Sequence, residues 1–291
     1  MKFSFVSLVT KLTLATSVAG ALAGCDDPTY PTPTPVSESS VGQARVLVVN
    51  AAPGTTGVGI TLDNTAFGTP LPYLGVSAAT SVPAGLRLFI YSEPTNIPAT
   101  PTVTPAPVTP LPVVTVARPV VARTAFLGGT NYTVFITDVP TRAYAAPITT
   151  TSDQGGIRTL TLTDNLAPPA VATSAKIRFV NLAPTATGGS TTYGIYNFPA
   201  GTPLFAAAPT RAYRAVSSTS TATPPVTTTF ANFTEVPAGP YTLDVRSAPT
   251  APLAGTQQVI TLVAGKIYTL YTRGIAGNAT MPLGISVVTH N

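Results

Sequence analysis

Short stretches of alternating apolar and polar residues recur along the chain. In residues 241–246, YTLDVR, apolar side chains occupy every second position, which predicts a strand with one buried face. Residues 44–50 and 175–181 show the same period. Because side chains alternate along a strand, each stretch is predicted to bury one face and expose the other. The faces expected to be exposed carry the basic side chains Arg45, Lys176 and Arg178.

Three blocks of sequence occur twice in the same order. They are residues 44–53 and 175–184, residues 82–85 and 236–239, and residues 129–134 and 265–270. Ordered matches of this kind indicate an internal duplication, and a repeat this long is a whole domain rather than a solenoid unit. The Val-Pro-Ala-Gly block is a turn signal that leads into a strand. The sequence therefore predicts an all-β protein with two tandem immunoglobulin-like or transthyretin-like β-sandwich domains.

The duplication sets the expected domain boundaries. The first sandwich is predicted over residues 44–165 and the second over 175–291, with a Pro-containing linker at 166–174. Each copy has an insertion without a counterpart, Pro-rich at 93–112 and Ser/Thr-rich at 209–229. Loops of this length are usually functional or disordered. Their compositions predict flexible or extended surface segments.

Four residues within the repeated blocks are expected to have structural roles. Asn50 and Asn181 each close a buried row where the chain turns at Ala-Pro, and a short amide side chain can bond nearby backbone there. Tyr132 and Tyr268 each follow a glycine turn at the start of a strand. In sandwiches such a tyrosine often buries its ring and bonds its hydroxyl across a corner, so both are predicted to lie in the core.

Composition agrees with an all-β globular protein. Hydrophobic residues make up 44% and charged residues 9%, which is the reverse of a disordered composition despite 31 prolines. Thr and Val are abundant and suit pleated strands. The formal charge is +5, but Lys2 and Lys11 belong to a leader and the arginines are scattered singly. Nucleic-acid binding requires a clustered basic patch, so we expect none.

Residues 1–24 have the organisation of a signal peptide. Lys2 and Lys11 supply positive charge, and the apolar stretch 12–21 is shorter than the ~20 residues of a membrane span. The segment ends in Leu-Ala-Gly-Cys, residues 22–25, which resembles the lipobox of bacterial lipoproteins. Cys25 is therefore predicted to become the first residue and to carry acyl chains such as palmitate. Several acyl chains on one residue suffice for stable anchoring.

The residues after Cys25 bear on where the protein resides. Residues 25–43 are expected to form the anchor and a spacer, in which Pro28–Ser40 favours an extended polyproline II conformation. Asp26 and Asp27 resemble the export signal of lineages with surface-exposed lipoproteins. In enteric-type systems, Asp directly after the cysteine instead resembles an inner-membrane retention signal. The acidic pair alone leaves both locations open. The family resemblance given in the next paragraph favours an outer-membrane lipoprotein at the cell surface, and a periplasm-facing anchored protein is the alternative.

The repeated blocks resemble the domain-of-unknown-function family 4397, a β-sandwich module of bacterial secreted and surface proteins. Residues 44–53 and 175–184 match its opening strand, and residues 264–269, AGKIYT, match its last block. The linker segment 163–168 resembles the joint of tandem lipoprotein members. The first copy departs from the pattern at Gly128-Gly129, where Ala-Gly is expected. The resemblance implies a fold, and the family lends no established activity or catalytic residues.

No catalytic, metal-binding or cofactor-binding residues are expected from the sequence. The only histidine, His290, lies one residue from the end, where chains commonly fray, and the only cysteine is assigned to lipid. A Ser-His-Asp or Cys-His nucleophile and a metal site built on imidazole or thiolate are excluded on this basis. Paired acids could meet only in three dimensions. The first of these acids lies in a predicted turn, Asp63-Asn64. The acids are isolated from one another in sequence and are Asp63, Asp138, Asp153, Asp164, Glu235 and Asp244.

Three classes of function are ranked on these observations. A structural or adhesive role in the cell envelope comes first, with the membrane as partner through the lipid on Cys25. Binding of a carbohydrate or another ligand comes second, because Tyr193 and Tyr196 fall on opposite faces of one strand and one ring is a candidate platform. Core packing is nevertheless expected for both rings. A hydrolase comes last.

We expect the substitution Cys25→Ala to release the protein from membranes in soluble or unprocessed form. The thiol is the only group in the lipobox that can take the lipid. Fractionation of cells followed by immunoblotting measures the effect. A mutant that remains in the membrane fraction at the mature size would show that the anchor is elsewhere.

Overall fold

The computed structural model describes most of the chain after residue 41. Within the described residues every regular element is a strand, and no helix there is long and apolar enough to cross a membrane. The predictions for the signal peptide, for Cys25, Asp26 and Asp27, and for most of the insertion 93–112 lie outside the described residues. The described ranges are 42–93, 120–143, 155–219, 224–248 and 251–291.

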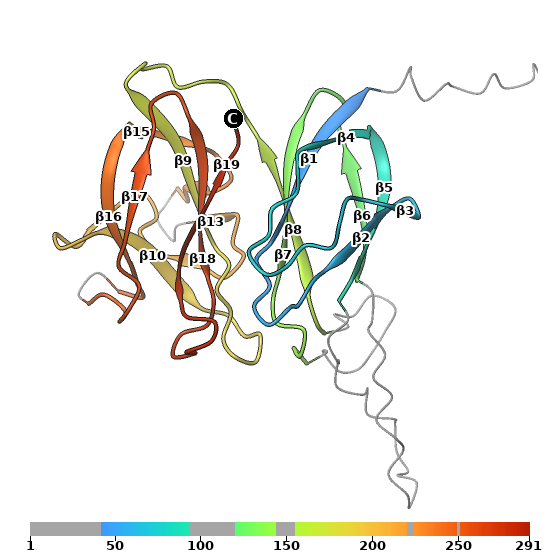
Figure 1. The fold of residues 1–291 in the computed structure, drawn as a ribbon. Coiled ribbons are helices and arrows are strands. Elements are labelled where there is room, and N and C mark those ends of the chain that lie inside the picture. Colours follow the sequence, from blue (N-terminus) through green and yellow to red (C-terminus); the bar gives the residue numbers. More distant parts are fainter. Residues whose placement is uncertain (1–41, 94–119, 144–154, 220–223, 249–250) are drawn as a thin grey trace, which may run out of the picture. The chain divides into compact units, whose positions relative to one another are not determined.

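The first sandwich is built from two four-stranded sheets (Figure 1). Its strands are β1 (Gln43–Asn50), β2 (Gly59–Leu62), β3 (Thr65–Ala66), β4 (Thr80–Pro83), β5 (Gly85–Ser92), β6 (Val120–Phe126), β7 (Asn131–Thr137) and β8 (Arg158–Asp164). One sheet has the order β4-β1-β7-β8 and the other the order β3-β2-β5-β6. Their inner faces enclose a core that includes Val46, Phe89 and Tyr132.

The second sandwich repeats this arrangement. Its strands are β9 (Ser174–Asn181), β10 (Thr192–Asn197), β11 (Thr202–Pro203), β12 (Arg211–Ala212), β13 (Ser217–Thr219), β14 (Thr227–Thr229), β15 (Thr234–Pro237), β16 (Gly239–Arg246), β17 (Gln258–Leu262), β18 (Ile267–Arg273) and β19 (Gly284–Thr289). One sheet has the order β15-β9-β18-β19 and the other contains β11-β10-β16-β17. Its core is separate and includes Ile177, Phe179 and Tyr268.

Strand pairing is the same in the two copies. β1 runs parallel to β7 with Val46 opposite Tyr132, and β9 runs parallel to β18 with Ile177 opposite Tyr268. All other pairings in these two sheets are antiparallel. The repeated sequence blocks therefore occupy equivalent places, and a residue in one copy has an identifiable counterpart in the other.

The residues predicted to be structural are confirmed as such. The hydroxyl groups of Tyr132 and Tyr268 accept hydrogen bonds from the backbone N–H groups of Leu127 and Val263, at 3.0 and 3.1 Å. Both rings are buried. The side-chain oxygen of Asn50 accepts from the N–H of Ala52, and that of Asn181 accepts from the N–H of Ala183. Both amides thus bond the turn that follows the strand.

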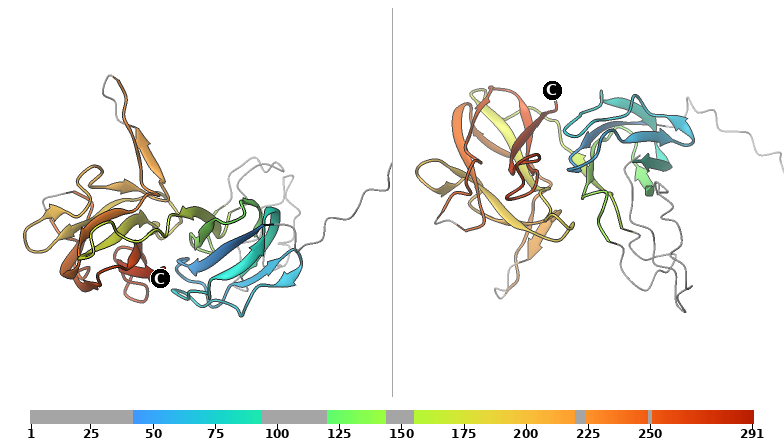
Figure 2. Two further views of the ribbon diagram at one scale, coloured as in Figure 1. Left: turned by 90° about the horizontal axis from the view of Figure 1, so that it is seen from above. Right: turned by 60° about the horizontal axis from the view of Figure 1, so that its bottom comes forward.

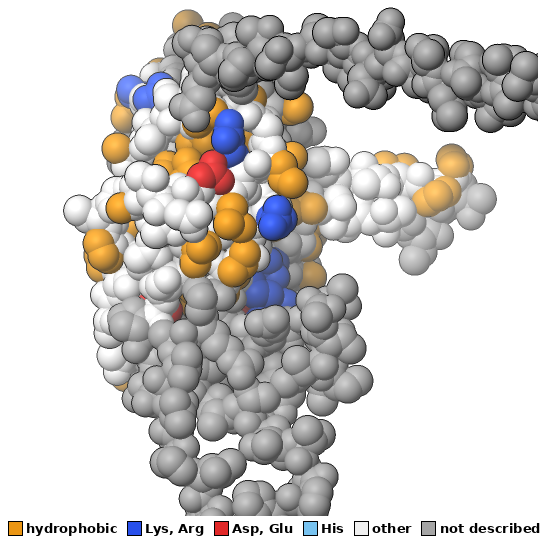
Figure 3. Space-filling model, turned by 90° about the vertical axis from the view of Figure 1, so that its right-hand side faces the viewer, with side chains coloured by type: hydrophobic (Ala, Val, Ile, Leu, Met, Phe, Trp, Pro, Cys, Tyr) orange, Lys and Arg blue, Asp and Glu red, His pale blue; other side chains and the backbone are white. Residues whose placement is uncertain are grey.

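The apolar stretch at residues 86–91 has a definite phase in the structure. Phe89 and Tyr91 are buried, and Leu86 faces outward with 62% of its surface exposed. On the neighbouring strand β6, Val121 is 59% exposed. Figure 3 shows the face of the first sandwich that carries β5, on which basic side chains lie apart among hydrophobic and uncharged ones. On the face shown, the basic residues are as scattered as the sequence indicated.

The two sandwiches belong to one compact unit, residues 41–291, because their β1 and β9 sheets bury apolar residues between them. The prediction that β1 and β9 each expose one face is therefore only partly correct. Gln43 and Arg45 at the start of β1 are exposed as expected, but Val49 on the same face of β1 is buried, and so is Arg178 on the corresponding face of β9. The sequence pattern marks the face that each copy buries in its own core, and it does not show that the other copy covers part of the second face. The shared cluster consists of Val49, Ala51, Phe135, Leu162, Val180, Leu182, Tyr271 and Val288.

The insertion 209–229 is only in part the flexible or extended surface segment that its composition predicted. Its first part is ordered against the second core, where Arg211 is buried. The Arg211 guanidinium lies 4.4 Å from the ring centroid of Phe230 and 4.6 Å from that of Phe205. Burial lowers the pKa of Arg211 to about 10. The later part forms the β13–β14 hairpin, which projects from the second sandwich as an exposed arm (Figure 2).

We expect the fragment Ala175–Asn291 to fold cooperatively but with a lower free energy of unfolding than Val41–Asn291. Its own core is complete, whereas Val180, Leu182 and Tyr271 lose their neighbours from the first sandwich. Burial of one large apolar side chain contributes about 1.5–3 kcal/mol, so the loss should reach several kcal/mol. Urea unfolding followed by circular dichroism measures it. Non-cooperative unfolding would contradict an independent second core, and equal stability would contradict a contribution from the shared cluster.

Candidate functional site

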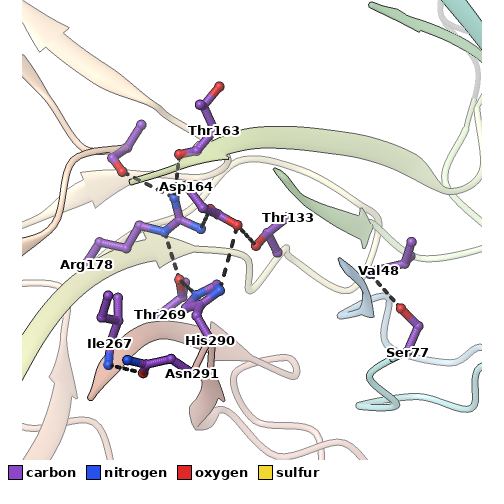
Figure 4. Close-up of polar contacts among 11 residues, drawn as sticks. Val48, Ser77, Thr133, Thr163, Asp164, Arg178, Ile267, Thr269, His290 and Asn291 are labelled. Atoms are coloured by element: carbon purple, nitrogen blue, oxygen red, sulfur yellow. Dashed lines mark hydrogen bonds and ion pairs between the residues drawn. The ribbon is translucent and has the colours of Figure 1, made fainter. Parts of the chain in front are cut away.

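A buried ion pair marks one end of the contact between the sandwiches. The Nη2 atom of Arg178, on β9, lies 2.5 Å from Oδ1 of Asp164, the last residue of β8. The side chains are 0% and 2% exposed. Figure 4 shows how Arg178 and Asp164 point toward each other. Arg178 also donates to the backbone oxygens of Thr163 and Ala231. The pair thus joins the first sandwich to the second through side chains that water does not reach.

His290 completes this polar cluster. Its Nε2 atom lies 2.7 Å from the hydroxyl of Thr269, and its Nδ1 atom lies 3.7 Å from Oδ2 of Asp164. The Thr269 hydroxyl accepts the Nε–H of Arg178. We therefore assign the hydroxyl proton of Thr269 to the bond with Nε2 of His290, and the ring proton of His290 to Nδ1. Asp164 accepts a further bond of 2.6 Å from the hydroxyl of Thr133. The expectation that His290 frays with the chain end is therefore wrong.

The charges of the cluster respond to burial. Burial lowers the pKa of Arg178, although the carboxylate of Asp164 opposes that shift. Burial also lowers the pKa of His290 to about 4, and Asp164 only partly offsets it. At neutral pH the imidazole is accordingly uncharged, which leaves Arg178 and Asp164 as a balanced pair.

The two copies supply equivalent positions to the cluster. Thr133 and Thr269 correspond, because each lies one residue after the tyrosine that pairs with the opening strand. Thr163 pairs with Tyr132, and Thr289 pairs with Tyr268. Asp164 and His290, the residues that follow these two threonines, are therefore equivalent. The duplicated scaffold therefore brings two threonines, an acid and a histidine to one end of the contact.

A second polar cluster surrounds Asp138 at the other end of β7. The carboxylate lies 2.5 Å from Nε of Arg158 and accepts a bond of 2.8 Å from the hydroxyl of Tyr213. Burial, followed by the charge of Asp138, raises the pKa of Tyr213. Asp138 has φ +70°, where its counterpart in the second copy is Gly274 with φ +78°. This left-handed turn costs an acid about 1–2 kcal/mol, which its ion pair and hydrogen bond offset.

A cavity of about 410 Å³ opens beside the Arg178 cluster. The ring of Phe233 separates the two, because its centroid lies 4.5 Å from the Arg178 guanidinium and 5.6 Å from the His290 ring. Among the described residues that line the cavity, Lys176 is the charged one, and its Nζ donates to the backbone oxygen of Ala167. The lining residues are Thr163, Asn165, Lys176, Ala231, Asn232 and Phe233.

The order hydroxyl, imidazole, carboxylate in Thr269, His290 and Asp164 resembles that of a catalytic triad, but its geometry opposes catalysis. Thr269 is 0% exposed, and its oxygen already accepts the Nε–H of Arg178. An imidazole with a pKa of about 4 is a poor general base at neutral pH, and 3.7 Å is too long for the supporting hydrogen bond. The arrangement is therefore suited to holding the sandwiches together.

The other residues singled out from the sequence lie apart from this cluster. Tyr193 and Tyr196 are 8% and 0% exposed, which confirms core packing for both. Asp63 and Asn64 form the turn between β2 and β3, as predicted, with φ of 47° and 67°. Asp244 makes two bonds of 2.8 Å to Arg246 on its own strand. Among the described residues no three His, Cys, Asp or Glu side chains gather to hold a metal ion.

Comparison with known proteins adds little about function. No protein-family model and no curated protein matches the chain. Among solved structures the chain is similar to the Bacillus anthracis TIE protein, with 10% sequence identity and a TM-score of 0.18. The match covers 80% of this chain and 34% of that one, so the chain spans about a third of that protein's length. At this TM-score the likeness supports no inference about activity.

We expect the free energy of unfolding to fall as the pH is lowered from about 7 to about 4. The folded protein keeps His290 uncharged until its pKa of about 4, whereas the unfolded chain protonates near the ordinary value of 6.5. The unfolded state therefore binds the extra proton in this window, and up to about 3 kcal/mol of stability is lost.

Urea unfolding of the wild type and of His290→Gln at several pH values measures this contribution. The chain has a single histidine. The variant should therefore lose less free energy of unfolding than the wild type as the pH falls from about 6.5 to 4. The same slope in both proteins would show that another group titrates.

Proposed function

We propose that the protein is a non-catalytic lipoprotein of the bacterial cell envelope, anchored through lipid on Cys25, with a structural or adhesive role at the cell surface. In this proposal it is a tandem member of the family 4397 sandwich modules. Asp26 and Asp27 would direct it outward, and the spacer 28–40 would separate the folded unit from the lipid. The expected location is the outer membrane, and the alternative is an anchored protein that faces the periplasm.

The observation that carries this proposal is how the polar residues between the sandwiches are used. Asp164, Arg178 and His290 are buried and bonded to one another and to neighbouring threonines. Asp138 binds Arg158 and Tyr213 at the opposite end. Each cluster spans both sandwiches, and apolar residues fill the space between them. Groups capable of chemistry thus fix the position of one sandwich against the other, which suits a protein that presents a surface.

The β13–β14 hairpin supports an adhesive role over a purely passive one. Ser217, Ser218 and Thr219 are exposed along β13. The base of the hairpin is anchored, because Phe230 is buried and its N–H donates to the oxygen of Val216 at 2.7 Å. Loops and arms held by a rigid scaffold commonly carry binding function. Contact with a surface protein or glycan is therefore expected on the insertion 209–229, with 93–112 as the second candidate.

A ligand-binding module is the second candidate function, and the cavity beside Phe233 favours it. Its volume of about 410 Å³ falls within the usual range for small-molecule sites. The lining combines one aromatic ring with amide, hydroxyl and ammonium groups. Binding at this cavity is compatible with surface anchoring, so the two functions do not exclude each other.

We expect protease added to intact cells to degrade the protein, because both sandwiches should face the medium. Immunoblotting after graded digestion measures this, with a periplasmic protein as the control for an intact outer membrane. First cleavage should fall in the exposed β13–β14 hairpin. Complete protection until the outer membrane is permeabilised would place the protein on the periplasmic side.

A further inference from the structure

We propose that the cavity beside Phe233 binds an acidic saccharide, with a sugar carboxylate at Lys176. The cavity lies where the end of β8, the start of β9 and the segment before β15 come together. Three separate parts of the chain therefore contribute to it, including residues on both sides of the linker. The site exists only when the two sandwiches are packed together.

Charge in the cavity favours an anion. Lys176 is the one charged residue among the described residues that line it, and its ammonium group donates to a neutral acceptor, the oxygen of Ala167, at 2.8 Å. An ammonium group has three N–H donors, so two remain for a ligand. Arg178 lies behind Phe233 and is balanced by Asp164. Glu235 pairs with Lys176 in the register of β15 with β9, but its carboxylate accepts the N–H groups of Ala170 and Val171. Among the described lining residues, the charge that faces the cavity is therefore that of Lys176.

The neutral lining residues favour a sugar over a simple anion. Asn165 accepts the N–H of Ala167 through its side-chain oxygen, which leaves its amide N–H₂ to donate. Asn232 is exposed and adds a second side-chain amide. Amides both donate and accept, which matches neighbouring sugar hydroxyls. The Phe233 ring, held by Arg178 and His290, offers an apolar surface for the C–H face of a pyranose.

The first sandwich provides an internal reference for this site. The register of β1 with β4 and of β9 with β15 makes Arg45 the counterpart of Lys176. The same register makes Ala78 and Ala79 the counterparts of Asn232 and Phe233. The first copy therefore keeps a basic residue at this place but has neither the amide nor the ring. A basic residue with no such surroundings is the matched control for the proposed site.

This inference deepens the ligand-binding function proposed above as the second candidate, and it relies on the proposed surface location only for contact with external polysaccharide. Binding by the folded unit needs neither the lipid on Cys25 nor display at the surface. A failure of anchoring would therefore leave the binding result intact. Conversely, a failure to bind would leave the anchoring proposal intact.

Isothermal titration calorimetry of Val41–Asn291, the compact unit that contains both cores, tests the site. The probes are tetragalacturonic acid, the neutral tetramer of galactose, and poly-glutamate as a carboxylate polymer without sugar. We expect tetragalacturonic acid to bind at least about tenfold more tightly than either control, since it alone satisfies both the ammonium and the ring. No binding, or equal binding of poly-glutamate, would overturn the proposal.

Substitutions then assign the binding to this cavity. Lys176→Met should weaken tetragalacturonic acid binding by about tenfold, whereas Lys176→Arg should retain it because the charge is kept. Arg45→Met, at the equivalent place in the first sandwich, should leave affinity unchanged. Asn232→Ala changes an exposed side chain and should weaken binding of both tetramers. Unchanged affinity in Lys176→Met, or an equal loss in Arg45→Met, would place the binding elsewhere and overturn the proposal.

Discussion

Burial of the second half of each opening strand on both faces is the constraint on which the rest of the structure depends. In each copy the opening strand lies inside its sheet between an antiparallel neighbour and a parallel one, β7 or β18. One face meets the core of its own sandwich, and the other meets the opposite sandwich through the shared apolar cluster. A polar side chain on either face must then find a partner within the protein, because water is absent there.

The two ion-pair clusters meet this requirement at the ends of the shared face. Removing one partner of a buried ion pair commonly lowers the free energy of unfolding by about 3–5 kcal/mol. Replacing the whole pair by apolar residues of similar volume often leaves that free energy unchanged or raises it. The effect of the two clusters is to make one packing of the sandwiches preferable to alternatives, since a shifted contact would separate Arg178 from Asp164 and break the hydrogen bond from Tyr213 to Asp138. The same reasoning explains why a hydroxyl, an imidazole and a carboxylate come together at Thr269, His290 and Asp164 without access for a substrate.

Differences between the two copies account for the features with functional interest. Arg178 takes the place of Leu47, and His290 takes the place of Asp164, so the copies complement each other across the contact. Phe233 takes the place of Ala79 and covers the new guanidinium. That ring then forms one wall of the cavity. The differences between the copies thus supply the buried ion pair between the sandwiches and one wall of the cavity beside it.

The amino-acid sequence determined the all-β fold, the duplication and the core-facing side of the opening strands, because alternation and turn residues act locally. It also placed Tyr132 and Asn50 correctly, since each bonds backbone close by in the chain. It left the phase of residues 86–91 open, because that stretch is apolar on both faces. Only the tertiary structure decided that Arg178 and His290 are buried. Their partners lie 14 residues away for Arg178 with Asp164 and 21 for His290 with Thr269. Asp164 comes from the other copy, and the Phe233 ring that covers both side chains comes from a distant part of their own copy. A period of two along a strand records which side chains share a face, but it does not record what packs against that face.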